Sequence, residues 1–203
     1  MNPEDYMGMI QDAITMGKNV CVMRHFDNFD IHSTHRPFVD VWPSCVRFNE
    51  EFDNTFTLLL QLACVLHMKG GWKTHWKIRI FIITETDSDG SMETLVIQDF
   101  LKEARIEAQV RVLPQPVGKL YNTFTDSFTT GARMGRGLDY YSSLNTLMKE
   151  YSDKASVIFT ALPLVPPEAA AARAYITELS TLSDNLPPLV MVYGSMPVIS
   201  NSL

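Results

Sequence analysis

The chain has 203 residues, of which 46% are hydrophobic and 20% charged, and its formal net charge is −6. These proportions are typical of a globular protein and exclude the collagen-like, coiled-coil and disordered classes. The excess of acids argues against a nucleic-acid-binding protein, whose affinity depends on neutralising phosphates, and the length suits a single domain spanning residues 1–203.

The first part of the chain predicts a helix followed by two strands. Pro3, Glu4 and Asp5 are typical of a helix start, and Gly17 is typical of a helix end. Residues 19–23 predict a short buried strand. Residues 38–42 predict a second strand, which Pro43 would stop.

The middle of the chain predicts helices and strands in alternation. Apolar residues at helical spacing predict a helix over residues 49–69, and the continuous apolar run at 78–83 predicts a strand covered on both faces. Residues 87–90 predict a turn, after which Ser91 would cap a helix. The side chains of that helix expected to face the core are those of Leu95, Val96, Phe100, Leu101 and Ala104. A strand follows at 108–113.

The last part of the chain repeats this alternation after a long loop. Residues 115–138 have no clear period and contain several glycines, which indicates a loop. Helical stripes at 141–151 and 171–182 alternate with apolar runs at 156–161 and 189–192, the second of which predicts a central strand. The fold class predicted is therefore α/β, a three-layer Rossmann-like and mostly parallel sheet with helices on both faces.

The cysteines and apolar runs bear on the compartment. The chain has three cysteines, Cys21, Cys45 and Cys64, and an odd number cannot pair completely in disulfides. Because their neighbours are mostly apolar, we expect reduced thiols in a cytosolic core. The N-terminal sequence is acidic and predicts no secretory signal. The longest apolar run, residues 56–68, is shorter than the roughly 20 residues that a membrane span needs.

Motifs for catalysis or for cofactors are weak, so no catalytic, metal or cofactor-binding residue is assigned. A metal site built from Cys21, His25, His32, His35 and Cys45 lacks the tight pairs of structural zinc sites. The glycine-rich residues 131–137 lack the Lys-Ser/Thr pair of a phosphate loop and follow a loop rather than a strand. Gly194-Ser195 lacks the elbow motif of hydrolases.

Two further features have ordinary explanations. The acid pairs Asp87/Asp89 and Glu50/Glu51 fall in a predicted turn and at a helix start, where carboxylates are solvated. Residues 54–80 carry four basic residues and no acid. That segment would suit anionic lipid or RNA, but a solvated edge between two buried elements is the explanation we favour.

Several segments, in order along the chain, resemble the C-terminal cytosolic domain of the cation-chloride cotransporters, solute carrier family 12. The run F-V-D-V-W at 38–42 resembles the family's I-D-V-W strand, and K-T-H-W-K-I-R-I-F at 73–81 resembles its K-W-K segment and the strand after it. R-I-E-A at 105–108, L-N at 144–145, A-L-P at 161–163 and D-N-L-P-P-L-V-M-V at 184–192 resemble later family segments. The residues to which we assign a structural role on this resemblance are Asp40, Val41, Trp42, Trp76, Arg79, Phe81, Arg105, Glu107, Asn145, Pro163, Leu186, Pro187, Pro188 and Gly194.

The resemblance implies the distal half of a cytosolic domain that neither binds nor moves ions. In the family such a domain serves dimerisation, trafficking and control of the membrane part. It thus implies a homodimer and a transmembrane partner, the rest of the parent transporter or a related cotransporter, at the cytosolic face of a membrane. The loop at 115–138 is short where many members carry a regulatory insertion, and Ser127, Thr129 and Thr130 lie within it. The ending Y-G-S-M-P-V-I is more similar to the branch called cotransporter-interacting proteins.

Three hypotheses follow. The first is a non-catalytic regulatory and dimerisation domain of a cation-chloride symporter-like membrane protein, without a cofactor. The second is a free-standing cytoplasmic protein that binds a nucleotide at the carboxyl ends of the strands of a Rossmann-like sheet. The third is an enzyme whose paired titratable groups the sequence does not reveal.

Overall fold

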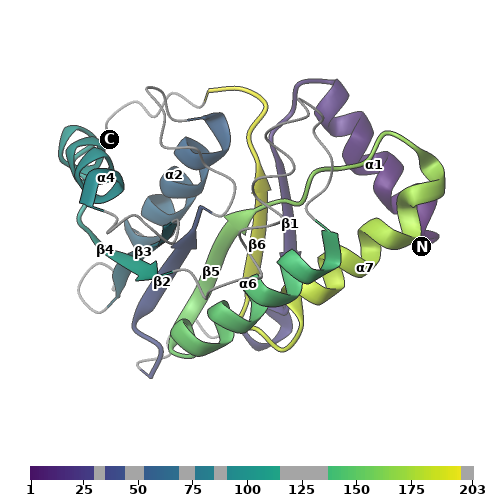
Figure 1. Cartoon of the computed structure of the whole chain (residues 1–203). Coiled ribbons are helices and arrows are strands. Elements are labelled where there is room, and N and C mark those ends of the chain that lie inside the picture. The colour runs from purple at the N-terminus through teal and green to yellow at the C-terminus, as the bar shows by residue number, and fades with distance from the viewer. Residues whose placement is uncertain (30–34, 44–52, 69–75, 85–90, 115–136, 198–203) are drawn as a thin grey trace.

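The computed structural model describes residues 1–29, 35–43, 53–68, 76–84, 91–114 and 137–197. Its elements alternate along the chain as the sequence predicts (Figure 1). The strands are β1 (Val20–Arg24), β2 (Phe38–Trp42), β3 (Lys77–Thr84), β4 (Ala108–Pro114), β5 (Ala155–Ala161) and β6 (Leu189–Tyr193). The α-helices are α1 (Pro3–Thr15), α2 (Asn54–Met68), α4 (Ser91–Glu103), α6 (Gly137–Tyr151) and α7 (Ala172–Ser183), with the short 3-10 helices η1 (Phe26–Asn28) and η2 (Ala169–Ala171).

The strands form one sheet in the order β1-β6-β5-β2-β3-β4. All neighbouring pairs are parallel except β1 with β6, which is antiparallel. From β2 the chain runs outward through β3 to β4, then returns to place β5 on the other side of β2 and continues to β6. The predicted α/β class is confirmed, and the strand order reverses between β2 and β5, as in doubly wound folds.

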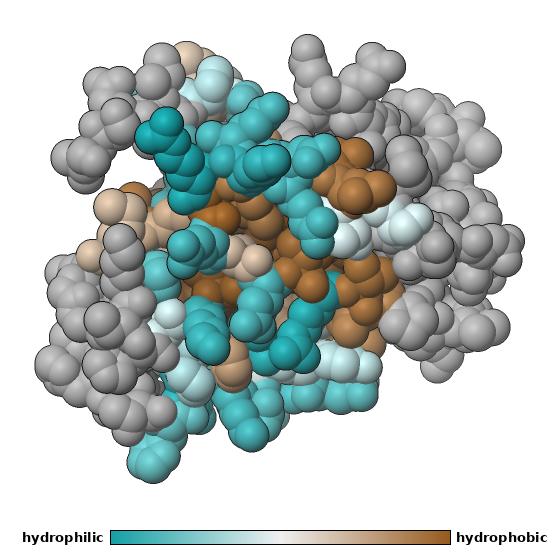
Figure 2. All heavy atoms as spheres, turned by 90° about the vertical axis from the view of Figure 1, so that its left-hand side faces the viewer, coloured by the Kyte–Doolittle hydropathy of each residue, from teal (hydrophilic) through white to brown (hydrophobic). Residues whose placement is uncertain are grey.

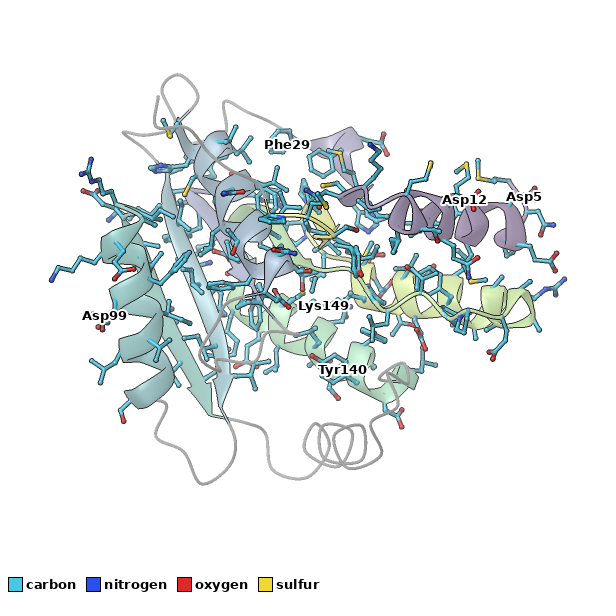
Figure 3. The ribbon with its side chains drawn as sticks, turned by 90° about the horizontal axis from the view of Figure 1, so that it is seen from above. Asp5, Asp12, Phe29, Asp99, Tyr140 and Lys149 are labelled. Carbon is cyan, nitrogen blue, oxygen red and sulfur yellow. The ribbon has the colours of Figure 1, made fainter. Side chains whose placement is uncertain are left out.

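Helices cover both faces of the sheet because successive strand residues point to opposite sides. In β2, Val39 and Val41 belong to the core under α2 and α4, whereas Trp42 belongs to the core under α1, α6 and α7. Figure 1 shows α6 and α7 on one side of the sheet and α2 on the other. Seen from above, α1 and α7 lie side by side at one end of the molecule and α4 at the other (Figure 3).

The ends of α1 follow the signals in the sequence. The Asn2 side chain accepts a bond from the Glu4 amide at the start of α1, and Gly17 has φ 67° just after its end. The end of α4 repeats this left-handed geometry with a non-glycine residue, since Arg105 has φ 55° and the Ile106 amide bonds back to the Leu101 carbonyl at 2.8 Å. Arg105 therefore serves as a turn residue between α4 and β4.

Two predictions about burial are wrong. Residues 19–23 are not a buried strand: β1 is the edge of the sheet, and Met23 is 57% exposed. The apolar run did not reveal that β1 has a neighbour on only one side. Leu95 of α4 is 54% exposed, and Ala104, which lies just past the end of that helix, is also exposed, while Ile97 of α4 is fully buried. The inward stripe of this helix runs through Ile97 and Leu101.

The cysteines are less uniform than predicted. Cys64 is half-buried on α2, and burial raises the pKa of its thiol to about 11, so it stays protonated at neutral pH. Cys21 is exposed on β1, which corrects its placement in the core, and both thiols are free. Cys45 lies outside the described residues.

Among the helices that the structure describes, none combines the length and the hydropathy needed to cross a membrane.

Candidate functional site

A buried ion pair lies where two segments of the family resemblance meet. Asp40 of β2 and Arg79 of β3 are register partners on neighbouring parallel strands. The Arg79 Nε donates to Asp40 Oδ1 at 2.7 Å, and its Nη2 donates to Asp40 Oδ2 at 2.6 Å. The Asp40 side chain is 0% exposed and the Arg79 side chain is 7% exposed. A two-pronged bond of this kind fixes both side chains in one orientation.

The C-terminal end of α6 contacts the ion pair. The second Nη2 bond of Arg79 goes to the backbone carbonyl of Tyr151 at 3.1 Å. Ser152, which is fully buried, bonds the Asp40 carboxyl and accepts a bond from the Trp42 indole Nε1 at 3.0 Å. The polar groups in the cluster therefore satisfy one another, and they join β2 and β3 to the C-terminal end of α6.

Aromatic rings surround the guanidinium of Arg79. Its centre lies 3.8 Å from the Phe38 ring centroid and 5.2 Å from that of Phe81. Phe81 stacks on Trp42 with centroids 4.4 Å apart and planes 11° from parallel. Cation–π contact and low solvent access both strengthen the charge interaction in such a cage.

Burial and the bonding partners act in opposite directions on the pKa of Asp40. Desolvation raises the pKa of the Asp40 carboxyl, and the bonds from Arg79 and Ser152 lower it in part. Every described polar partner of the carboxyl holds it in place, and Asp40 is not among the residues that line the pocket between α2, α4, β3 and β4. This arrangement suits a structural pair rather than an acid or base that must reach a substrate.

A second group of resemblance residues closes the end of α7. The amide of Asn145, on α6, donates to the carbonyls of Leu182 at 3.0 Å and Asp184 at 2.9 Å. The last carbonyls of a helix have no partner within the helix, so a buried end needs donors of this kind. The chain then turns through buried Leu186 and half-buried Pro187 into buried Pro188, whose carbonyl accepts a bond from the Ile158 amide at 2.8 Å.

Two more resemblance residues lie beyond the carboxyl ends of β5 and β6. The Gly194 amide donates to Thr55 Oγ1 at 3.1 Å, and a Cβ at position 194 would lie 2.5 Å from the Asn54 carbonyl oxygen. Only glycine permits β6 to approach the start of α2 so closely. The Pro163 carbonyl accepts a bond from the Tyr175 hydroxyl at 3.3 Å.

A third group lies at the amino ends of β3 and β4. Trp76 and Glu107 line an open pocket of about 570 Å³ between α2, α4 and these strands. Arg105 occupies the turn before β4, as described above. Val41, the remaining resemblance residue, is fully buried in the core under α2. The resemblance residues thus form separate joints within the fold and no single site.

The structure bears only in part on the weaker hypotheses. The His25 ring bonds the Ser183 carbonyl through Nε2 at 2.8 Å, so this nitrogen serves the end of α7. Across the described part of the chain, no three His, Cys, Asp or Glu side chains come together as metal ligands. His32, Cys45, both acid pairs and residues 131–136 of the glycine-rich run lie outside the described residues, as do Ser127, Thr129 and Thr130.

Sequence reasoning identified Asp40 and Arg79 but not their partnership, and it did not identify Ser152 or Tyr151. The two charged residues stand among apolar strand residues, one on each of two predicted neighbouring strands. Opposite charges within two buried strands were a usable signal, because a charge in a core needs a partner. Ser152 carried no comparable signal, since its role depends on where α6 ends.

The ion pair can be tested by a double-variant cycle in urea unfolding at neutral pH. Asp40→Leu or Arg79→Met alone leaves an unpaired buried charge, and we expect each to lower the free energy of unfolding by about 3–5 kcal/mol. The double variant should cost clearly less than the sum. As a control, Lys149→Met breaks the exposed Lys149–Asp184 pair and should change little. Strictly additive losses from the two core substitutions would contradict this account.

Relatives of this chain carry the names of solute carriers and of a cation-chloride cotransporter. Solute carrier family 12 member 9 of Danio rerio is 30% identical over 227 residues, which cover 100% of this chain and 24% of that protein. The protein of the same name from Xenopus laevis is 26% identical over 217 residues, which again cover 100% of this chain and 24% of that protein. Vacuolar cation-chloride cotransporter 1 of Saccharomyces cerevisiae is 24% identical over 139 residues, 61% of this chain and 12% of that one.

A solved structure shares the fold. The cytoplasmic domain of a prokaryotic cation chloride cotransporter aligns with a TM-score of 0.53 and 13% identity, covering 95% of this chain and 58% of that one. No family model matches the chain. The chain spans about a quarter of the length of the member 9 proteins, 24% in each case. Along its whole length the chain is similar to members of solute carrier family 12, and part of it is similar to a cation-chloride cotransporter.

Proposed function

We propose that this chain, as one domain of residues 1–203, is a non-catalytic cytosolic regulatory and dimerisation domain of a cation-chloride symporter-like membrane transporter. The observation that carries the proposal is the similarity of the whole chain to a quarter of two transporters. The fold shared with a cotransporter's cytoplasmic domain supports the cytosolic location. Its partners would be a second copy of the chain and the transmembrane part of the parent transporter or of a related cotransporter.

The described polar groups support a role without catalysis. Asp40 and Arg79 are held by each other, and Asn145 is held by helix carbonyls. A catalytic group needs access to a substrate and a partner that can exchange protons with it. The resemblance residues instead stiffen joints between elements, which suits a domain that transmits or restrains movement of an attached membrane part.

The alternative function, nucleotide binding, would use the place where the strand order reverses. There the ends of β2 and β5 carry Trp42, Pro43, Leu162 and Pro163, all of which are buried. Buried apolar side chains offer no donors to phosphate groups. This chemistry favours the regulatory domain over the nucleotide-binding protein.

Calorimetry separates these two functions. We expect titration of the purified chain with ATP or ADP to give no saturable heat, because the side chains described at the ends of β2 and β5 are buried and apolar. Saturation in the micromolar range or tighter would contradict the proposal and support the nucleotide-binding alternative. ATP with and without Mg²⁺ should be compared, so that a metal-dependent site is not overlooked.

For the homodimer, the free edge of β1 is the surface we favour. β1 and β4 are the two outer strands. β4 carries the exposed charge of Arg111, of the kind that protects sheet edges from pairing, whereas β1 exposes Cys21 and Met23. Two β1 strands could pair about a twofold axis and continue the sheet from one copy into the next.

Light scattering tests the dimer and its surface together. The mass of the chain should rise from monomer to dimer with concentration. Met23→Lys places a charge at the favoured edge and should shift the equilibrium to monomer, whereas Met68→Lys on α2, a residue of similar exposure, should not. A strict monomer at high concentration would overturn the homodimer, and equal effects of both variants would overturn the choice of surface.

A further inference from the structure

The pocket at the amino ends of β3 and β4 is a feature that the proposed function does not use. Its floor is apolar and is formed by Trp76, Ile78, Leu101 and Ile106, of which the first three are buried. Its volume of about 570 Å³ falls within the roughly 300–1,000 Å³ of small-molecule sites. Figure 2 views the molecule from the side of α4 and shows hydrophobic atoms exposed between polar side chains there.

The ionisable groups around this floor have a net positive charge. Lys77 and Lys102 contribute two ammonium groups and Glu107 one carboxylate. Within the described residues, neither lysine takes part in an ion pair. His67 also lines the pocket, but its Nε2 bonds the Trp76 carbonyl at 2.8 Å, which helps to hold the pocket wall.

We propose that this pocket binds a small amphipathic carboxylate, a molecule with one acidic group and an alkyl or aryl body. The body would lie on the indole and aliphatic floor, where it is removed from water, and the carboxylate would lie near Lys77 and Lys102 at the rim. A neutral apolar molecule would leave the ammonium groups without a partner, and a cationic one would be repelled by them.

The pocket is separate from the other places that the fold offers. It opens at the amino ends of β3 and β4, whereas a nucleotide in a doubly wound fold binds beyond the carboxyl ends of strands. It also differs from the β1 edge, since β1 and β4 are the opposite outer strands of the sheet. Ligand binding here therefore succeeds or fails independently of nucleotide binding and of dimerisation.

The experiment titrates the isotope-labelled full chain with octanoate and follows amide and indole resonances by NMR. We expect saturable shifts of the Trp76 indole, assigned with Trp76→Phe, and of residues 101–109. Two probes of the same chain length serve as controls: 1-octanol, which lacks the charge, and octylammonium, which reverses it. Both should bind more weakly than octanoate.

Two variants at the rim give effects of opposite sign. Lys102→Met should weaken octanoate binding and Glu107→Gln should strengthen it, each by roughly two- to fivefold, as expected for exposed charge pairs. Both positions are exposed, so the fold should be unaffected. Absence of saturable shifts, equal binding of octanol and octanoate, or the same affinity in both variants would each overturn the proposal.

Discussion

A charge that leaves water for the interior of a sheet needs an opposite charge in good geometry, and the Asp40–Arg79 pair meets that constraint here. The two residues are register partners on β2 and β3, so the pair forms only when these strands align correctly. Because Arg79 also bonds the Tyr151 carbonyl, the pair further requires α6 to end at the right place. One interaction thus links the centre of the sheet to the helix layer above it.

The other joints follow the same principle of satisfying buried polar groups across elements. Asn145 of α6 donates hydrogen bonds to carbonyls at the end of α7. Thr55, at the start of α2, accepts a hydrogen bond from the Gly194 amide. These contacts join segments far apart in sequence, and they use residues that carry the family resemblance. The shared motifs are therefore understandable as requirements of the fold, without any reaction to account for them. This interpretation fits a domain whose work is done through its surfaces.

Much of this architecture could be predicted from sequence because the local signals were strong. Apolar runs ended by proline marked β2 and β4, and the helix end at Gly17 required only its backbone preference. The edge position of β1 could not be predicted, since an apolar run does not reveal how many neighbours a strand has. Likewise, the pairing of Asp40 with Arg79 and the role of Ser152 depend on strand order and on where α6 ends. Strand order and the end point of α6 are properties of the folded chain.

The central claim, a cytosolic domain that acts on a membrane transporter, is tested most directly by sequencing the transcript upstream of the codon for Met1. The account predicts an open frame that continues upstream and encodes apolar spans of roughly 20 residues each, as a transporter's membrane part requires. An in-frame stop codon close to Met1, with no such spans before it, would contradict the claim.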